Sequence, residues 1–138
     1  MNPFKQKTLI QIRFKDIDKL GHVNNSNHIT YFEIARLDYF HELTQHELEI
    51  DWKNEGIILA KLEMEYKQPI FLEDKVFVYT WVSHIGFKSF EMSCTIVRVV
   101  NEKEEIAAKG KAIIVCFNYK TNESIPMPDS WKRLMLGE

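Results

Sequence analysis

Chemistry-bearing residues are concentrated in one short run near the N-terminus. It holds two acidic residues, a glycine, a histidine and a pair of asparagines: Asp16, Asp18, Gly21, His22, Asn24 and Asn25. A carboxylate can attack a carbonyl carbon or activate a water molecule for that attack. Free backbone N–H groups at a helix N-terminus can bind the oxyanion that the attack creates. The run is therefore a candidate site for acyl chemistry, provided that a helix begins directly after it.

A segment with helical spacing does follow, from residue 29 to residue 43. One side of its helical wheel gathers Ile29, Phe32, Ala35, Tyr39, Phe40 and Leu43, with Arg36 inside the same arc. Further apolar residues lie on other faces, so the helix is apolar nearly all round and must be covered on most sides. Residues 24 to 27 are all types that cap helices, and we expect the cap at residues 25 to 27.

The rest of the chain is typical of strands. Residues 8–14 alternate as a half-buried strand with Ile10, Ile12 and Phe14 on the apolar side. Four more strands are predicted at 57–66, 75–82, 87–99 and 106–117, with turns at 83–86 and 101–104 and a short helix at 130–136. Residues 41–53 are polar and suggest an extra helical turn. Consecutive strands joined by short loops favour an antiparallel meander with the helix on one face, in a single α+β domain spanning 1–138.

Composition excludes several classes of protein. The net charge of −2 argues against a general nucleic-acid binder. No apolar run approaches the ~20 residues that span a bilayer, and the N-terminus has no apolar signal-peptide core. We therefore expect a cytoplasmic protein with no membrane partner. Cys94 and Cys116 lie in strand-like patterns and are interpreted as buried apolar residues, not as a disulfide. No Cys/His spacing suggests a zinc site.

The run at residues 13–36 also resembles a known family. Asp-x-Asp-x-x-Gly-His-Val-Asn-Asn, followed by Tyr31, Glu33 and Arg36, is similar to the hotdog-fold acyl-CoA thioesterases of the 4-hydroxybenzoyl-CoA thioesterase type. Weaker matches continue at Pro69, Asp74 and residues 87–90, and His28 stands where relatives usually carry Tyr. The resemblance implies the hotdog fold, an antiparallel sheet of about five strands wrapped around one long central helix.

The resemblance also implies roles for individual residues. It makes Asp18 the catalytic base or nucleophile, with Asp16 in support, and the backbone N–H of Asn25 the oxyanion donor. His22 is a candidate catalytic residue that could equally hold the loop. His28, Lys88 and Ser89 are predicted to bind substrate, and Lys88 and Ser89 would contact the phosphates or the pantetheine arm of coenzyme A. No metal and no bound cofactor is expected, because coenzyme A is part of the substrate.

The activity so predicted is hydrolysis of an acyl-CoA thioester to a free acid and CoA. Alternatives are an acyl-ACP thioesterase, a hydratase of the same fold and a non-catalytic acyl-CoA-binding hotdog dimer. Because so small a sheet cannot cover a helix that is apolar nearly all round, we expect a homodimer or homotetramer with the site at or near the subunit interface. The sequence leaves the acyl group open.

Overall fold

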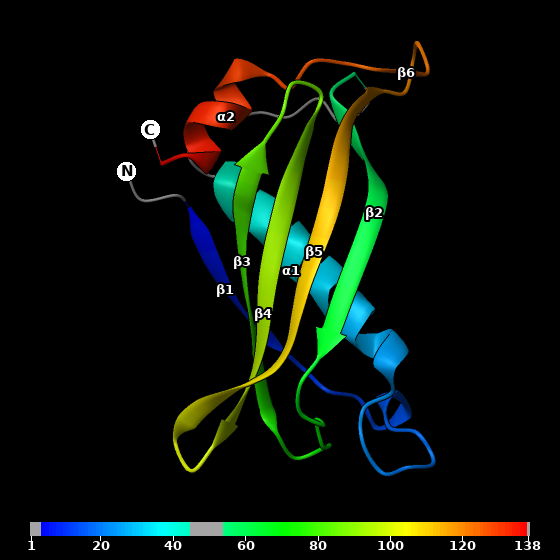
Figure 1. The fold of residues 1–138 in the computed structure, drawn as a ribbon, viewed down its shortest axis with the longest axis vertical. Coiled ribbons are helices and arrows are strands. Elements are labelled where there is room, and N and C mark those ends of the chain that lie inside the picture. The colour runs from blue at the N-terminus through cyan, green and yellow to red at the C-terminus, as the bar shows by residue number, and fades with distance from the viewer. Residues whose placement is uncertain (1–3, 45–53, 138) are drawn as a thin grey trace.

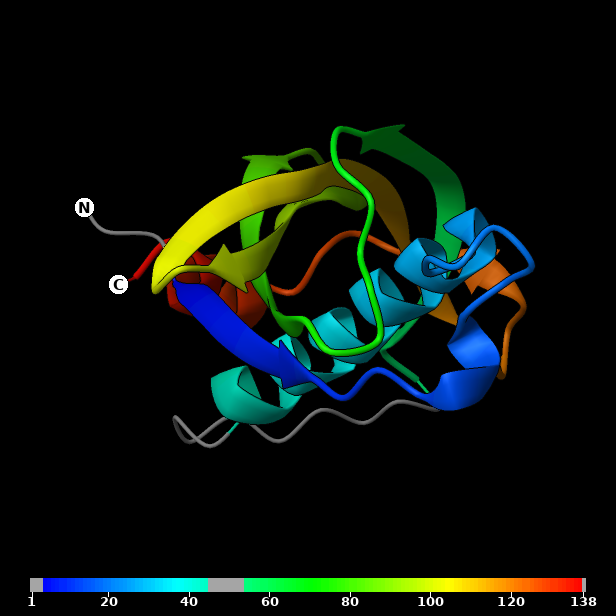
Figure 2. The ribbon, with the colours of Figure 1, turned by 90° about the horizontal axis from the view of Figure 1, so that it is seen from below.

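The computed structural model describes residues 4–44 and 54–137, and a single antiparallel sheet dominates it (Figure 1). Its strands lie side by side in the order β1 (Lys5–Ile10), β3 (Lys75–Ile85), β4 (Ser89–Val100), β5 (Lys103–Asn118) and β2 (Gly56–Tyr66), and β6 (Glu123–Ser124) pairs with β5. The sheet curves around one long helix, α1 (Asn25–Thr44), as Figure 2 shows from below. The predicted α+β hotdog architecture is confirmed.

The side-chain alternation of β3, β4 and β5 builds the core between the sheet and α1. Phe90, Met92, Cys94 and Ile96 are all buried, as predicted. Both cysteines are buried with free thiols, in agreement with the interpretation that they pack as small apolar residues. β4 and β5 are joined by a tight hairpin in which Asn101 and Glu102 both have positive φ, the conformation that matches the twist of the strands.

Helix α1 begins four residues before the apolar segment that predicted it. Its buried side carries His28, Tyr31, Phe32, Ala35, Arg36, Tyr39, Phe40 and Leu43. Ile29, predicted to lie among the core residues of the helix, is instead 38% exposed, and Ile34 and Leu37 are 45% and 65% exposed. One chain therefore leaves apolar helix surface uncovered, as the sequence predicted. No helix in the described part of the chain is long and apolar enough to cross a membrane.

The first strand is shorter than predicted. β1 ends at Ile10, and Phe14 is 83% exposed within a 3-10 turn, η1 (Phe14–Asp16), instead of lying on the buried side of a strand. The Asp16 carboxylate accepts a hydrogen bond from the Arg13 N–H at 3.1 Å, and the Asp16 N–H donates to the Arg13 carbonyl at 2.9 Å. These local bonds replace ladder pairing, so the chain leaves the sheet early.

Other boundaries differ by a few residues. β3 continues through Ile85, and the turn that follows is closed by the Gly86 N–H donating to the Ser89 carbonyl at 2.7 Å. The C-terminal helix, α2, spans Asp129–Met135. The helical turn predicted within residues 41–53 lies largely outside the described residues, and residues 41–44 are the end of α1.

Candidate functional site

Asp18 lies in the loop between η1 and α1, with its carboxylate held at both oxygens. Oδ1 accepts the Leu20 N–H at 2.8 Å, and Oδ2 accepts the side-chain amide of Asn24 at 3.0 Å. These bonds, with that from Leu20 the stronger influence, lower the pKa of Asp18. Gly21 closes the turn with a φ of 89°, a conformation that glycine adopts without strain. The half-buried carboxylate is thus an oriented anion at neutral pH.

The helix start lies directly beside this carboxylate. The Asn24 side-chain oxygen accepts the Ser26 N–H at 3.0 Å and so caps α1, one residue earlier than predicted. The backbone N–H of Asn25, the first helical residue, has no hydrogen-bonding partner among residues 4–44 and 54–137. That N–H is a free donor at the positive end of a long helix, where negative charge is stabilised.

His22, Asn25 and His28 line one cavity of about 240 Å³ beside the helix start, together with Tyr66 and residues 67–69. The His28 ring packs edge-on against Tyr66 with centroids 4.9 Å apart, and the Tyr66 hydroxyl donates to the Asn25 carbonyl at 3.1 Å. Burial lowers the pKa of His28, an effect that the nearby Asn24 and Asn25 carbonyls only partly offset, so its imidazole is neutral at pH 7. His22 is half-buried, and its Nδ1 lies 3.2 Å from the Val23 carbonyl.

Lys88 and Ser89 lie at the other end of the sheet (Figure 1). On β5, Ala108 is opposite Tyr66 and Val115 is opposite Ser89. The distance along β5 from Ala108 to Val115 is roughly 24 Å, at a rise of about 3.4 Å per residue. Lys88 is exposed, and its ammonium lies 3.4 Å from the Ser124 hydroxyl. One chain therefore brings together Asp18, His22, Asn25 and His28 but keeps Lys88 and Ser89 away from them.

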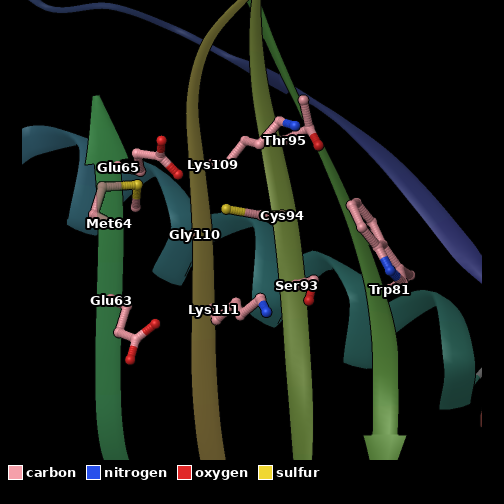
Figure 3. A pocket seen from close by; sticks show the side chains of 10 residues that line it. All are labelled: Glu63, Met64, Glu65, Trp81, Ser93, Cys94, Thr95, Lys109, Gly110 and Lys111. Carbon is pink, nitrogen blue, oxygen red and sulfur yellow. The ribbon is translucent and has the colours of Figure 1, made fainter. Parts of the chain in front are cut away.

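Another cavity, of about 380 Å³, lies on the sheet face that is turned away from α1 (Figure 3). It contains none of the predicted site residues. A cross-strand row of Glu63, Lys111, Ser93 and Trp81 runs across it. This mixed-charge groove is built on strands, so it offers no N–H group of a helix start.

The sequence predicts neither the presence of Tyr66 in the site nor the bond from Asn24 to Asp18. Tyr66 continues the apolar alternation of β2, and no local signal connects it with His28, from which it is separated by 38 positions. Asn24 lies in the predicted run and caps the helix, and its amide also orients Asp18. An asparagine directly before a helix start and a few residues after an aspartate is a usable signal for such a bridge.

A family model described as "Thioesterase-like superfamily" matches residues 12–134 of the chain. The chain belongs to this superfamily. It is therefore an enzyme of the thioester hydrolase class, as the sequence predicted.

Individual relatives agree over nearly the whole chain. The long-chain acyl-CoA thioesterase FadM of Escherichia coli (strain K12) is 23% identical in an alignment of 127 residues, and the match covers 88% of this chain and 89% of that protein. A thioesterase from Thermus thermophilus, solved in complex with coenzyme A and Zn, is 32% identical with a TM-score of 0.79, and the match covers 94% of this chain and 90% of the Thermus chain. A 4-hydroxybenzoyl-CoA thioesterase has a TM-score of 0.82 at 16% identity over 95% of this chain and 98% of its own, which supports the fold alone.

Proposed function

We propose that this protein hydrolyses acyl-CoA thioesters to a free acid and CoA. The observation that carries the proposal is the juxtaposition of the oriented Asp18 carboxylate with the Asn25 N–H, which has no partner in the described part of the chain. The Asn24 side chain donates a hydrogen bond to the Asp18 carboxylate, and the Asn25 N–H belongs to the peptide bond that follows Asn24. The relatives named for acyl-CoA hydrolysis and the relative solved with coenzyme A support the choice of substrate.

In the proposed reaction the thioester carbonyl oxygen lies at the Asn25 N–H. Asp18 either attacks the carbonyl carbon itself or removes a proton from the water that attacks it. Negative charge develops on the carbonyl oxygen, where the N–H and the helix end stabilise it. The C–S bond then breaks, CoA leaves as a thiolate that takes up a proton, and the acid is released. Direct attack by Asp18 requires a second step in which water hydrolyses the acyl-aspartate anhydride.

The two histidines have different proposed roles. Neutral His28, buried against Tyr66, would contact the substrate near its carbonyl end without adding charge there. His22 lines the same cavity from the loop and is a second candidate for proton transfer. Replacing each with Gln separates the roles, since a proton-transfer residue changes the pH dependence of kcat and a contact residue changes KM.

We also propose that the working enzyme is at least a homodimer built on β2. The outer edge of β2 pairs with no strand in the described part of the chain, and Ile58 and Leu59 on it are 37% and 44% exposed. An unpaired strand edge with exposed apolar residues is a template for pairing with another chain. Two β2 edges paired antiparallel would set the Gly56 end of one copy beside the Tyr66 end of the other. Lys88 and Ser89 would then approach the partner's site.

Release of CoA thiol, followed with DTNB across a panel of acyl-CoAs, tests the activity directly. We expect turnover with wild type and near-complete loss with Asp18→Asn. Light scattering of the wild type and of Leu59→Lys tests the assembly, with a dimer or tetramer expected for the first and smaller species for the second. Absence of thiol release from every acyl-CoA would refute the proposed activity, and a fully active wild-type monomer would refute the proposed assembly.

A further inference from the structure

Asp16 is a buried carboxylate to which the proposed reaction gives no role. Its side chain is 1% exposed, and an anion so placed is costly unless it is well paired. Its oxygens accept three hydrogen bonds, from the Tyr31 hydroxyl at 2.7 Å, the Arg13 guanidinium at 3.0 Å and the Arg13 N–H at 3.1 Å. Burial by itself raises the pKa of Asp16, but these bonds outweigh it and lower the pKa overall.

The backbone carbonyl of the same residue faces the start of α1. It accepts the Asn24 N–H at 2.9 Å and the Asn27 side-chain amide at 3.0 Å. Asp16 therefore connects the segment that follows β1, through Arg13, with the inner face of α1, through Tyr31. The same residue also fastens the start of the helix on both sides of Asn25.

Asn24 transmits this placement to the reacting groups. Its backbone N–H is held by Asp16, its side-chain amide donates to Asp18 at 3.0 Å, and the next peptide carries the free Asn25 N–H. A shift of Asn24 would move the carboxylate and the oxyanion donor together. Displacements of about 1 Å in such a pair can reduce a rate by roughly 10²-fold.

We propose that Asp16 and Tyr31 are positioning residues that hold Asn24, and through it align Asp18 with the Asn25 N–H. We call this unit, Asp16 with Tyr31, Arg13 and Asn24, the Asp16 clamp. The inference rests on the proposed function, because it assigns the reaction to Asp18 and Asn25. Neither Asp16 nor Tyr31 touches the substrate in this scheme.

Tyr31→Phe tests the clamp, since it removes one hydroxyl and keeps the ring in the core. We expect kcat to fall on the order of tenfold with little change in KM, because alignment is lost while substrate contacts remain. The matched control is Tyr79→Phe on the outer sheet face, whose hydroxyl bonds to Glu104 at 2.8 Å. The control should keep wild-type kcat, and circular dichroism establishes that both variants are folded.

The second readout is the pKa of the Asp18 carboxyl group, which can be measured without substrate turnover. If Asn24 moves, Asp18 loses a donor to its ionised form, so its pKa rises and the acid limb of the rate profile moves to higher pH. The other titratable group that acts on Asp18 is His22, which is unchanged in both variants. Carboxyl ¹³C titration of Asp18 measures the shift directly and requires no substrate.

The outcomes are distinguishable. Lower kcat with a raised Asp18 pKa in Tyr31→Phe, and neither in Tyr79→Phe, supports the clamp. A folded Tyr31→Phe with wild-type kcat and an unshifted Asp18 titration overturns it. If Tyr31→Phe does not fold, Asp16→Asn takes its place with the same expectations. A wild type that hydrolyses no thioester refutes the proposed function, and the Asp18 titration then decides the clamp alone.

Discussion

The two ends of the sheet are organised differently, although the sequence predicted site residues at both. At the loop end, the side chains of Asp16, Asp18 and Asn24 are joined into hydrogen bonds that orient both carboxylates. At the other end, Lys88 is exposed, and its ammonium makes one long contact of 3.4 Å. The first arrangement is suited to chemistry, which needs fixed geometry. The second is suited to holding a mobile charged group.

The same contrast separates two aspartates that lie two positions apart. Asp16 is 1% exposed and accepts bonds from Tyr31 and Arg13, whereas Asp18 is half-buried and faces the helix start. Residue type alone does not distinguish a reacting carboxylate from a supporting one. Burial and the identity of the donors do.

The largest expected effect is at Asp18. Asp18→Asn keeps the shape of the side chain and removes the base, so kcat should fall by roughly 10²–10⁴, the usual contribution of a positioned base. Asp16→Asn should cost much less, because it disturbs alignment and leaves the base in place. DTNB kinetics on both variants measure the difference, and equal losses would remove the distinction between the two carboxylates.

Features that depend on neighbouring residues could be predicted from the sequence, and features that depend on distant residues could not. The strands, α1 and the position of Asp18 in the loop before α1 depend on alternation and on residues within one short run. The early end of β1 depends on a side-chain bond between Asp16 and Arg13, which periodicity does not encode. The contact between His28 and Tyr66, and the distance of Lys88 from the loop, depend on strand register across the whole sheet. Such long-range geometry has no local signal.

The next effect in size concerns Asn24, which joins the carboxylate to the helix. Asn24→Ala removes the donor to Asp18 and the cap on Ser26, so kcat should fall by roughly 10–100-fold and the free energy of unfolding by about 1 kcal/mol. Asn118→Ala is the matched control, because Asn118 caps a turn by accepting the Lys120 and Thr121 N–H groups. It should lose similar stability and keep kcat. Equal kcat in the two variants would mean that Asn24 only caps the helix and does not position Asp18.

A smaller effect is expected at Lys88, where binding alone is at stake. Lys88→Ala should raise KM for an acyl-CoA by about 3–10-fold with little change in kcat, as removal of a uniform contact does. Added salt should weaken the wild type more than the variant. An acyl-N-acetylcysteamine, which lacks the nucleotide, should not distinguish the two proteins. If Lys88→Ala raises KM equally for both substrates, Lys88 supports the fold and does not contact CoA.

Mixed assemblies show which chain Lys88 serves. In a dimer of one Asp18→Asn subunit and one Lys88→Ala subunit, a site shared between chains would leave the surviving Asp18 paired with the lysine of the other subunit, which is intact. We then expect a wild-type KM and half the wild-type kcat per dimer. If Lys88 served its own chain, the surviving Asp18 would lie beside the mutated lysine and KM would stay raised.

The smallest effect concerns pH and the stability of the loop end. The pKa of Asp16 is lower in the folded protein than the ~3.9 of an unfolded chain. A group with a depressed folded pKa contributes stability above its unfolded pKa and loses it as pH falls through the folded value. Unfolding by urea should therefore show wild-type stability declining below about pH 4.

Asp16→Asn should be less stable than wild type at pH 7 and should decline less steeply in acid, so the two curves converge. Asp18 also has a lowered pKa, and by the clamp proposal Asp16→Asn raises it, so the contribution of Asp18 changes the variant's curve in the same direction. Asp129→Asn is the control, because that side chain is 89% exposed, and its curve should stay parallel to wild type. Parallel curves for Asp16→Asn would mean that the Asp16 bonds to Tyr31 and Arg13 add nothing to the folded state. The loop end would then owe its order to the bonds that Asp18 accepts from Asn24 and Leu20.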